Sequence, residues 1–338
     1  MSFLIAFGLA IVLTPIAGWL GRALGLVDRP GELKIHDRAI PLTGGVAVVA
    51  ASVIAVTVLG RWLPWQALAG VLVAFAAGLI DDVRPLPAWL RLNLQALAGV
   101  LVALELQLGP LGAAGTIFAV VATANAVNII DGQDGLSAGV GTLAALGLAG
   151  VLAAVGAPGL GLALALAGAL LGFLARNRPP ARIFLGNGGA YAVGTLLAAL
   201  GASAAQTAGW RGLLAAGACL GLLAFEVVFS VARRAWSGSA LSGGDRGHSY
   251  DLLADRVGRG RSTLLMWTGA AIAAGVGVAA AAWPDRYAAA VLAGGGLLAG
   301  VVWVALWRLG RIRRMPERTY GARVVPSGQS GPKIEVET

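Results

Sequence analysis

Apolar segments of membrane-spanning length recur eleven times along this chain of 338 residues. A helix needs about 20 apolar residues to cross the hydrocarbon core of a bilayer. The segments are 3–24, 44–60, 65–80, 92–108, 116–130, 138–156, 159–175, 188–205, 212–232, 264–283 and 287–307. Charged residues make up only 12% of the chain, against about 25% in soluble domains. The sequence therefore predicts an all-α integral membrane protein, a polytopic bundle of about ten or eleven transmembrane helices, and excludes a soluble globule or a nucleic-acid-binding protein.

The distribution of basic residues predicts the orientation of this bundle. With eleven spans, one side of the membrane carries 22 of the 25 Lys and Arg residues, and the other side only Arg61, Arg211 and Arg286. Loops rich in Lys and Arg remain in the cytoplasm. We therefore expect a multi-pass protein of the inner (plasma) membrane. Residues 1–307 are predicted to form one membrane-embedded domain, followed by a basic, disordered cytoplasmic tail over 308–338.

Acidic residues share the side that is rich in Lys and Arg. Thirteen of the 16 Asp and Glu residues fall there, and the exceptions are Glu105, Glu226 and Asp285. The positive-inside rule counts only Lys and Arg, so this concentration needs a second cause. Loops tolerate charge in general, but that alternative does not explain why the opposite loops hold a single acid. We predict a composite polar site built from several cytoplasmic loops.

Two adjacent carboxylates, Asp81 and Asp82, end the segment 65–80. Two like charges beside hydrocarbon are costly unless a cation or hydrogen bonds compensate them. Arg84 or Arg91 could compensate the pair as a structural feature. Alternatively, a Mg²⁺ ion that also binds substrate phosphate oxygens would compensate the two carboxylates and give the pair a functional role, because Mg²⁺ is usually held by one or two carboxylates plus substrate phosphates.

A row of amide and acidic side chains enters the same side of the membrane. Asn125, Asn128 and Asp131 are spaced by three, near one helical face, and Asp134 follows on a glycine-flanked turn. Amides deep in a span are expensive unless they are hydrogen-bonded. The row is suited to recognising a base or ribose, and hydrogen bonding between helices is the alternative.

Three further loops carry groups suited to anions. Lys34 and His36 lie in a basic loop that could equally be a topology signal. Asn187, among glycines, is expected to act as an N-cap over a backbone anion nest. His248 lies in an arginine-rich loop between two aspartates, which favours a phosphate or acid–base role. A positive-inside signal or a contact with anionic lipid is the alternative for that loop.

Five motifs follow one another on this face. They are D-x-P…K-x-H…P…G-G, D-D followed by Arg91 and Gln95, N-x-x-N-x-x-D-G-x-D-G-L, N-x-x-P-A-x-I-F-x-G, and D-R-x-H. In this order, from Asp28 to Leu253, the chain resembles the polyprenyl-phosphate N-acetylhexosamine-1-phosphate transferases (glycosyltransferase family 4). This integral-membrane family contains the peptidoglycan translocase MraY and the initiating enzymes of enterobacterial-antigen and teichoic-acid synthesis.

The resemblance implies a reaction and its partners. A UDP-HexNAc, with UDP-GlcNAc as the first candidate, would donate HexNAc-1-phosphate to an undecaprenyl-type polyprenyl phosphate and release UMP. This transfer would be the first membrane step of a cell-envelope polysaccharide. Mg²⁺, with Mn²⁺ as a substitute, would be the cofactor, and a homodimer is one assembly to consider.

The resemblance also implies roles for individual residues. Catalytic roles would fall to Asp81, Asp82 and His248, and metal binding to Asp81, Asp82 and Asn187. Substrate binding would fall to Lys34, His36, Asn128, Asp131, Asp134, Arg182 and Arg246.

Three departures from the family pattern leave alternatives open. The family usually has a metal-binding Asp where this chain has Asn187, its multiple-histidine motif keeps only His248, and its intramembrane acid appears as Glu226. One alternative is a catalytically weak paralogue that binds polyprenyl phosphate or a nucleotide sugar without turnover. Another is an ion-coupled transporter that uses Glu105 and Glu226.

Overall fold

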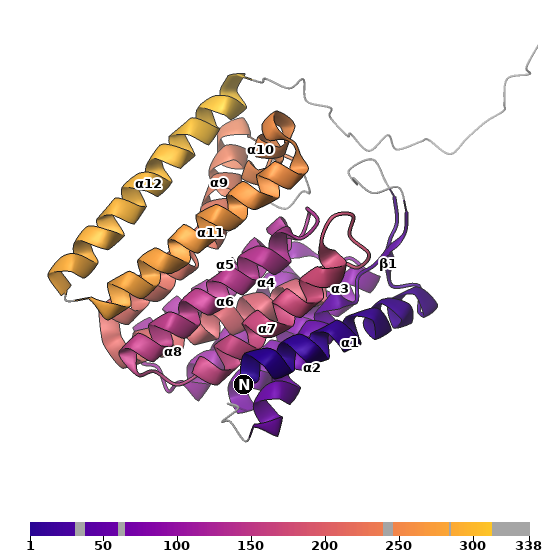
Figure 1. The fold of residues 1–338 in the computed structure, drawn as a ribbon, viewed down its shortest axis with the longest axis horizontal. Helices are drawn as coiled ribbons and strands as arrows, with labels where there is room; N and C mark the ends of the chain where they lie inside the picture. The colour runs from indigo at the N-terminus through magenta and orange to yellow at the C-terminus, as the bar shows by residue number, and fades with distance from the viewer. Residues whose placement is uncertain (31–37, 60–64, 239–245, 284, 313–338) are drawn as a thin grey trace, which may run out of the picture.

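The computed structural model describes residues 1–30, 38–59, 65–238, 246–283 and 285–312 (Figure 1). The described part is almost entirely helical. Its helices are α1 (Ser2–Ala23), α2 (Gly44–Val58), α3 (Trp65–Val83), α4 (Ala88–Glu105), α5 (Pro110–Ile130), α6 (Leu136–Val155), α7 (Leu160–Asn177), α8 (Gly186–Cys219), α9 (Gly221–Ser237), α10 (Ser249–Val257), α11 (Arg259–Ala282) and α12 (Asp285–Ile312). Two short antiparallel strands, β1 (Val27–Asp28) and β2 (Ile40–Pro41), join α1 to α2.

The predicted fold class is confirmed. Nine helices within the described ranges are long and apolar enough to cross a membrane, and the apolar helix α2 is shorter. The predicted tail lies almost wholly beyond residue 312, outside the described residues, and its order stays a prediction.

The eighth and ninth predicted spans meet at a sharp reversal within α8. Ala208 and Gly209 leave the helical conformation, and Gly209 has a φ of +58°. A Cβ on Gly212 would lie 2.0 Å from the carbonyl oxygen of Ala204, although eight residues of straight helix span about 12 Å. The chain therefore folds back on itself where the sequence predicts a connection over 206–211.

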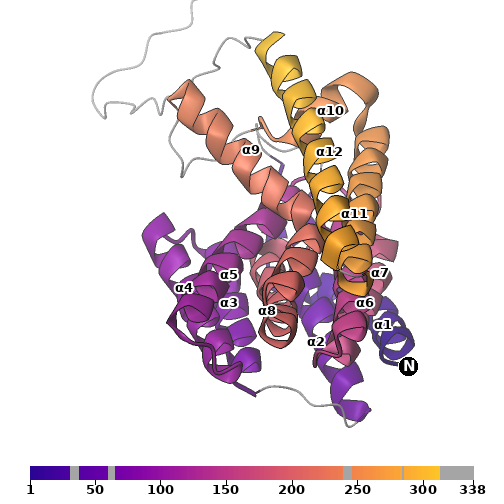
Figure 2. The same ribbon diagram turned by 90° about the vertical axis from the view of Figure 1, so that its left-hand side faces the viewer.

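The prediction of one helix over 212–232 is wrong. The returning arm of α8 ends at Cys219, Leu220 leaves the helical conformation, and α9 begins at Gly221. Apolar residues continue across this break, so hydropathy alone does not reveal it. In Figure 2, α9 diverges from α11 and α12 as it leaves the bundle.

Helix α8 lies at the centre of the bundle and packs against α2, α3, α5, α6 and α11; the returning arm contacts α11, where Gly277 lies against Ala215 and Cys219. Small residues allow these helices to approach closely. A Cβ on Gly45 of α2 would lie 2.2 Å from the Cα of Gly189, and a Cβ on Gly78 of α3 would lie 2.3 Å from the carbonyl oxygen of Asn187. The beginning of α8 is thereby fixed against the ends of its neighbours.

Helices α1, α3, α5 and α7 terminate at one end of the bundle, where α8 begins. We call this end the polar end. The β1–β2 pair joins this end, because the backbone N–H of Phe184, just before α8, donates to the carbonyl oxygen of Pro41 at 2.8 Å. Helix α10 joins it through the Tyr250 hydroxyl, which donates to the carbonyl oxygen of Ile129 near the end of α5 at 2.9 Å. Segments that are far apart in the sequence therefore meet at one end.

Candidate active site

A cavity of about 1420 Å³ opens at the polar end. Its walls come from the ends of α3 and α5, the start of α8, and the segment that leads into α10. It brings together eight of the predicted site residues: Asp81, Asp82, Asn128, Asp131, Asp134, Asn187, Arg246 and His248. Lys34 and His36 lie outside the described residues. Arg182 lines a smaller neighbouring cavity instead.

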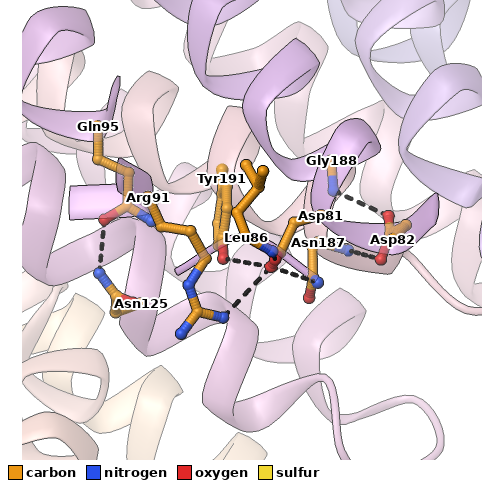
Figure 3. Close-up of polar contacts among 9 residues, drawn as sticks. All are labelled: Asp81, Asp82, Leu86, Arg91, Gln95, Asn125, Asn187, Gly188 and Tyr191. Carbon is orange, nitrogen blue, oxygen red and sulfur yellow. Dashed lines mark hydrogen bonds and ion pairs between the residues drawn. The ribbon is translucent and has the colours of Figure 1, made fainter. Parts of the chain in front are cut away.

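Asp81 is buried and surrounded by hydrogen-bond donors (Figure 3). One carboxylate oxygen accepts the backbone N–H of Leu86 at 2.7 Å. The other accepts the Arg91 guanidinium at 3.3 Å, the Asn187 side-chain amide at 2.9 Å and the Tyr191 hydroxyl at 3.3 Å. The charge of Asp81 is thus compensated within the protein, chiefly by Arg91, which was one of the two interpretations of the Asp pair.

Asp82 lies beneath the first turn of α8. Its two carboxylate oxygens accept the backbone N–H groups of Asn187 at 3.0 Å and Gly188 at 3.2 Å. The adjacent N–H, that of Gly186, donates to Asp131 at 3.2 Å. Two aspartates therefore occupy the free N–H groups of this helix end, where a negative charge is favoured by the helix dipole.

The predicted N-cap role of Asn187 is wrong. The N-cap position of α8 is Leu185, and Asn187 lies within the first turn. Because Asp82 and Asp131 take the first three N–H groups, the nest holds the protein's own carboxylates and no external anion. The side chain of Asn187 instead points at Asp81.

Gly186 is required by this arrangement. Its φ is +75°, a left-handed conformation that favours glycine. A Cβ there would also lie 2.2 Å from the carbonyl oxygen of Leu42 and 2.9 Å from a carboxylate oxygen of Asp82. Any larger residue would therefore push Asp82 away from the start of α8.

Asp131 follows the end of α5 and is held on both carboxylate oxygens. The Ser137 hydroxyl donates to one at 2.5 Å, and the Gly186 N–H donates to the other. Burial raises the pKa of Asp131 to about 7, although these two hydrogen bonds act to lower it. The group can therefore change its charge near neutral pH.

The turn after Asp131 is tied to the segment before α8. Asp134 accepts the backbone N–H of Ala181 at 2.9 Å. Buried Asn177 accepts the N–H of Gly135 at 3.1 Å and donates to the carbonyl oxygen of Ile183 at 2.9 Å. These bonds fix one wall of the cavity.

The two amides of the predicted row have different partners. Asn125 donates to the side-chain oxygen of Gln95 on α4 at 2.7 Å, so it follows the interhelical alternative. Asn128 lines the cavity, and its side chain makes no hydrogen bond within the described part of the chain. Asn128 is therefore the amide of this pair that can bind a ligand.

His248 is buried at the start of α10 and fixed in position. Its Nδ1 lies 2.9 Å from the Ser230 hydroxyl of α9, and its ring stacks on Tyr250 with centroids 5.4 Å apart. Glu226 of α9 accepts the hydroxyl and the backbone N–H of Ser249. Glu226 thus contacts the start of α10, because α10 folds back against α9.

The predicted metal ligands differ in their capacity to bind a cation. Asp81 already accepts four protein donors. Asp82 accepts one donor on each oxygen, so each oxygen keeps a lone pair, and Asn187 keeps its side-chain oxygen. No group of three or more His, Cys, Asp or Glu residues suited to a metal occurs in the described ranges. Mg²⁺ needs few protein carboxylates when substrate phosphates supply further ligands, so this oxygen set fits Mg²⁺.

Sequence reasoning missed several residues of the site. Tyr191 touches Asp81, Ser230 orients His248, and Tyr250 joins α10 to α5. Tyr191 follows Asn187 by four residues, so the two share one face of α8, and this spacing could have found it. Ser230 carried no such signal, because its partner lies across a loop.

These features define a polytopic membrane protein with a polar site buried at one end. The model of glycosyl transferase family 4 matches residues 64–205. A probable undecaprenyl-phosphate N-acetylglucosaminyl 1-phosphate transferase of Bacillus subtilis is 26% identical over 75% of this chain and 76% of its own length. An undecaprenyl-phosphate alpha-N-acetylglucosaminyl 1-phosphate transferase of Thermotoga maritima is 28% identical over 76% of this chain and 83% of its own length. A phospho-N-acetylmuramoyl-pentapeptide-transferase of Acaryochloris marina is 45% identical over 33% of this chain and 31% of its own length. The chain is thus similar to glycosyl transferase family 4 over residues 64–205, and these relatives bear out the resemblance.

Proposed function

We propose that this protein transfers a sugar 1-phosphate, specifically HexNAc-1-phosphate, from a UDP-sugar to a polyprenyl phosphate of the undecaprenyl type. UDP-GlcNAc is the first candidate donor, because two of the relatives described above carry names of GlcNAc-1-phosphate transfer. The observation that carries the proposal is the joining of acidic, amide and basic side chains from separate segments in one cavity.

The reaction is a phosphoryl transfer. An oxygen of the acceptor phosphate would attack the β-phosphorus of the donor, the bond from that phosphorus to the bridging oxygen would break, and UMP would leave. Catalysis of this kind depends mainly on positioning and on neutralising charge. Arg246 and His248 line the cavity and are suited to hold the phosphates, and Asn128 is suited to the uridine or ribose. A general base is hardly needed, since a phosphate monoester with a second pKa near 6 is mostly ionised at pH 7.

The cavity walls also suit a lipid acceptor. Three exposed apolar residues, Leu92 of α4, Phe118 of α5 and Val231 of α9, contribute to the lining. A polyprenyl tail could lie along these side chains in the bilayer while its phosphate enters the polar part. The long apolar tail would then stay in a lipid environment throughout the reaction.

Mg²⁺ is proposed as the cofactor, with Mn²⁺ as a substitute. Asp82 and the side-chain oxygen of Asn187 would hold it, and it would neutralise the negative charge of the diphosphate. Asp81 would position Asn187 through their hydrogen bond. We place the site at the cytoplasmic face of the inner membrane and assign it the first membrane step of a cell-envelope polysaccharide.

The test is a transfer assay with the full-length protein in membranes. Labelled UDP-sugars, undecaprenyl phosphate and Mg²⁺ should yield a lipid-linked product and UMP. Asp82→Asn should abolish both products, whereas Asp255→Asn, an exposed position outside the cavity, should leave them unchanged. A folded preparation that makes no product from any UDP-HexNAc would overturn the proposed activity.

A second candidate is a weak paralogue that binds the same ligands without turnover. The observation in its favour is the Asn187–Asp81 hydrogen bond, which places a neutral amide where the family usually has a metal-binding carboxylate. Binding of undecaprenyl phosphate or UDP-GlcNAc without UMP release would identify this case. The transporter alternative is less favoured, because Glu226 is bound to Ser249 and Glu105 accepts the N–H of Gln66.

A further inference from the structure

A second cavity, of about 340 Å³, lies beside the first at the polar end. It is an open cavity lined by the second half of α1, the residues that lead into β2, the last turn of α7 and the segment that follows it. Its charged lining is entirely basic: Arg22, Arg38, Arg176 and Arg182. No Asp or Glu lines it among the described residues, whereas the larger cavity contains five aspartates.

The arginines are placed there by the fold. The backbone N–H of Arg182 donates to the carbonyl oxygen of Arg176 at 2.9 Å, so the chain turns back and brings the two residues together. The guanidinium of Arg38 donates to the carbonyl oxygen of Ala181 at 3.3 Å. Arg22, Arg176 and Arg182 make no ion pair with a carboxylate in the described structure.

Helix dipoles do not balance this charge. Arg22 and Arg176 each lie in the last turn of a helix, and a helix end contributes about half a negative charge. Two helix ends therefore offset about one of the three positive charges of Arg22, Arg176 and Arg182. Arginines that serve only as a topology signal could spread into solvent independently, so the convergence of these three on one cavity, with no acid among its described lining residues, calls for an anionic ligand.

The position of the cavity indicates which anion. Thr14, Pro15 and Gly18 of α1 complete its lining, and the outer face of α1 exposes Ile16, Trp19 and Leu20. Tryptophan at a helix end marks the level of lipid headgroups. A lipid phosphate could therefore enter among the arginines while its acyl chains follow α1.

We propose that this cavity binds the phosphodiester headgroup of an anionic glycerophospholipid. Basic pockets between transmembrane helices on the cytoplasmic side favour such headgroups. Arg38 and Ile40 line both cavities, whereas Asp82 and Asp131 line only the larger one. Given the proposed function, a phosphate bound here would lie apart from the aspartates of the transfer site, which argues against the polyprenyl acceptor as its occupant. A bound headgroup would instead steady the wall that the two cavities share.

The test measures lipid binding by the purified full-length protein, by native mass spectrometry and by thermal unfolding. Phosphatidylglycerol should bind and raise the unfolding midpoint, and phosphatidylcholine should do neither. The double variant Arg22→Gln/Arg176→Gln should weaken phosphatidylglycerol binding by about tenfold or more, because it removes two charged hydrogen-bond donors from the cavity. Arg22→Lys/Arg176→Lys should retain part of the affinity and serves as a second, charge-preserving variant.

The control removes the same charge from the same end of the protein. Arg84 and Arg256 are exposed and line neither cavity, so Arg84→Gln/Arg256→Gln should bind like the wild type. Equal loss in both double variants would overturn the site in favour of general attraction to a charged surface. Equal protection by inorganic phosphate, or displacement of phosphatidylglycerol by undecaprenyl phosphate at this site, would overturn the phospholipid assignment. None of these measurements requires sugar transfer, so a failure of the proposed activity would be distinguishable.

Discussion

Replacing Asn187 by Asp should make the protein depend on a divalent cation for its stability. The Asn187 amide donates to Asp81 at 2.9 Å, and the substitution would place a second carboxylate at that position. Two unit charges 2.9 Å apart repel by about 6 kcal/mol at an effective dielectric constant of about 20. Movement to about 5 Å reduces this to about 3 kcal/mol. The expected loss is therefore about 3–6 kcal/mol without metal, in addition to the lost hydrogen bond.

Thermal unfolding in EDTA and in a Mg²⁺ titration measures this effect. Asn187→Asp should unfold several degrees below the wild type in EDTA, and Mg²⁺ should stabilise the variant more than the wild type, because the cation turns the repulsion into shared attraction. Asn93→Asp makes the same chemical change at an exposed position on α4 and should show neither effect. An unchanged midpoint in EDTA, or equal Mg²⁺ shifts in variant and wild type, would refute the reasoning. A transfer rate raised tenfold or more in the variant would favour the weak-paralogue candidate.

Three further substitutions test other contacts of the site. Arg91→Met should destabilise the protein by about 3 kcal/mol, since it leaves the buried Asp81 carboxylate without the cation of its half-buried ion pair. Arg91→Lys should recover most of the loss in thermal unfolding, and equal losses would contradict a charge effect. Asp131→Asn should stabilise the protein relative to wild type increasingly as pH rises from about 4 to about 7. Over this range the wild-type carboxyl ionises in the unfolded chain, whereas its raised pKa keeps it uncharged in the folded protein, so the wild type loses stability and the Asn variant does not. A difference in unfolding midpoint that is constant with pH would count against this. Ser230→Ala should lower the transfer rate less than His248→Ala does, because it removes only the group that orients the ring, and a larger effect of the serine change would show that His248 is not the acting group.

The arrangement of the spans could be predicted because it depends on properties that are local in sequence. Segment length and hydropathy located the helices. The distribution of Arg residues between the two sides predicted the orientation of the spans, and this orientation places Asp81, Asp131 and His248 at one end. The break at Leu220 could not be predicted in this way, since it interrupts a continuous apolar run. Beyond the break, α9 packs against α5 and α11, which are contacts between segments far apart in the sequence.

The contacts between residues of the site were less predictable than the set of residues that form it. The sequence shows that Asp81 and Asp82 are adjacent, but adjacency alone does not separate their roles. The structure does: Asp81 is compensated by Arg91 and Asn187, whereas Asp82 faces the start of α8. Likewise, Asn187 was expected at a helix cap because glycines surround it, but α8 begins two residues earlier, at Gly186, with Leu185 in the N-cap position.

The two cavities at the polar end differ in a way that follows from what each would have to hold. In the proposed transfer, the larger cavity would hold a divalent cation and the reacting phosphates. It would then need acids for the cation and bases for the phosphates, and it contains both. A lipid headgroup that is only bound keeps its charge, and bases alone suffice for it. The smaller cavity, with four arginines and no acid among its described lining residues, has that composition. Since both cavities share the wall of Arg38 and Ile40, the lipid that surrounds the bundle could set the rigidity of the transfer site without entering it.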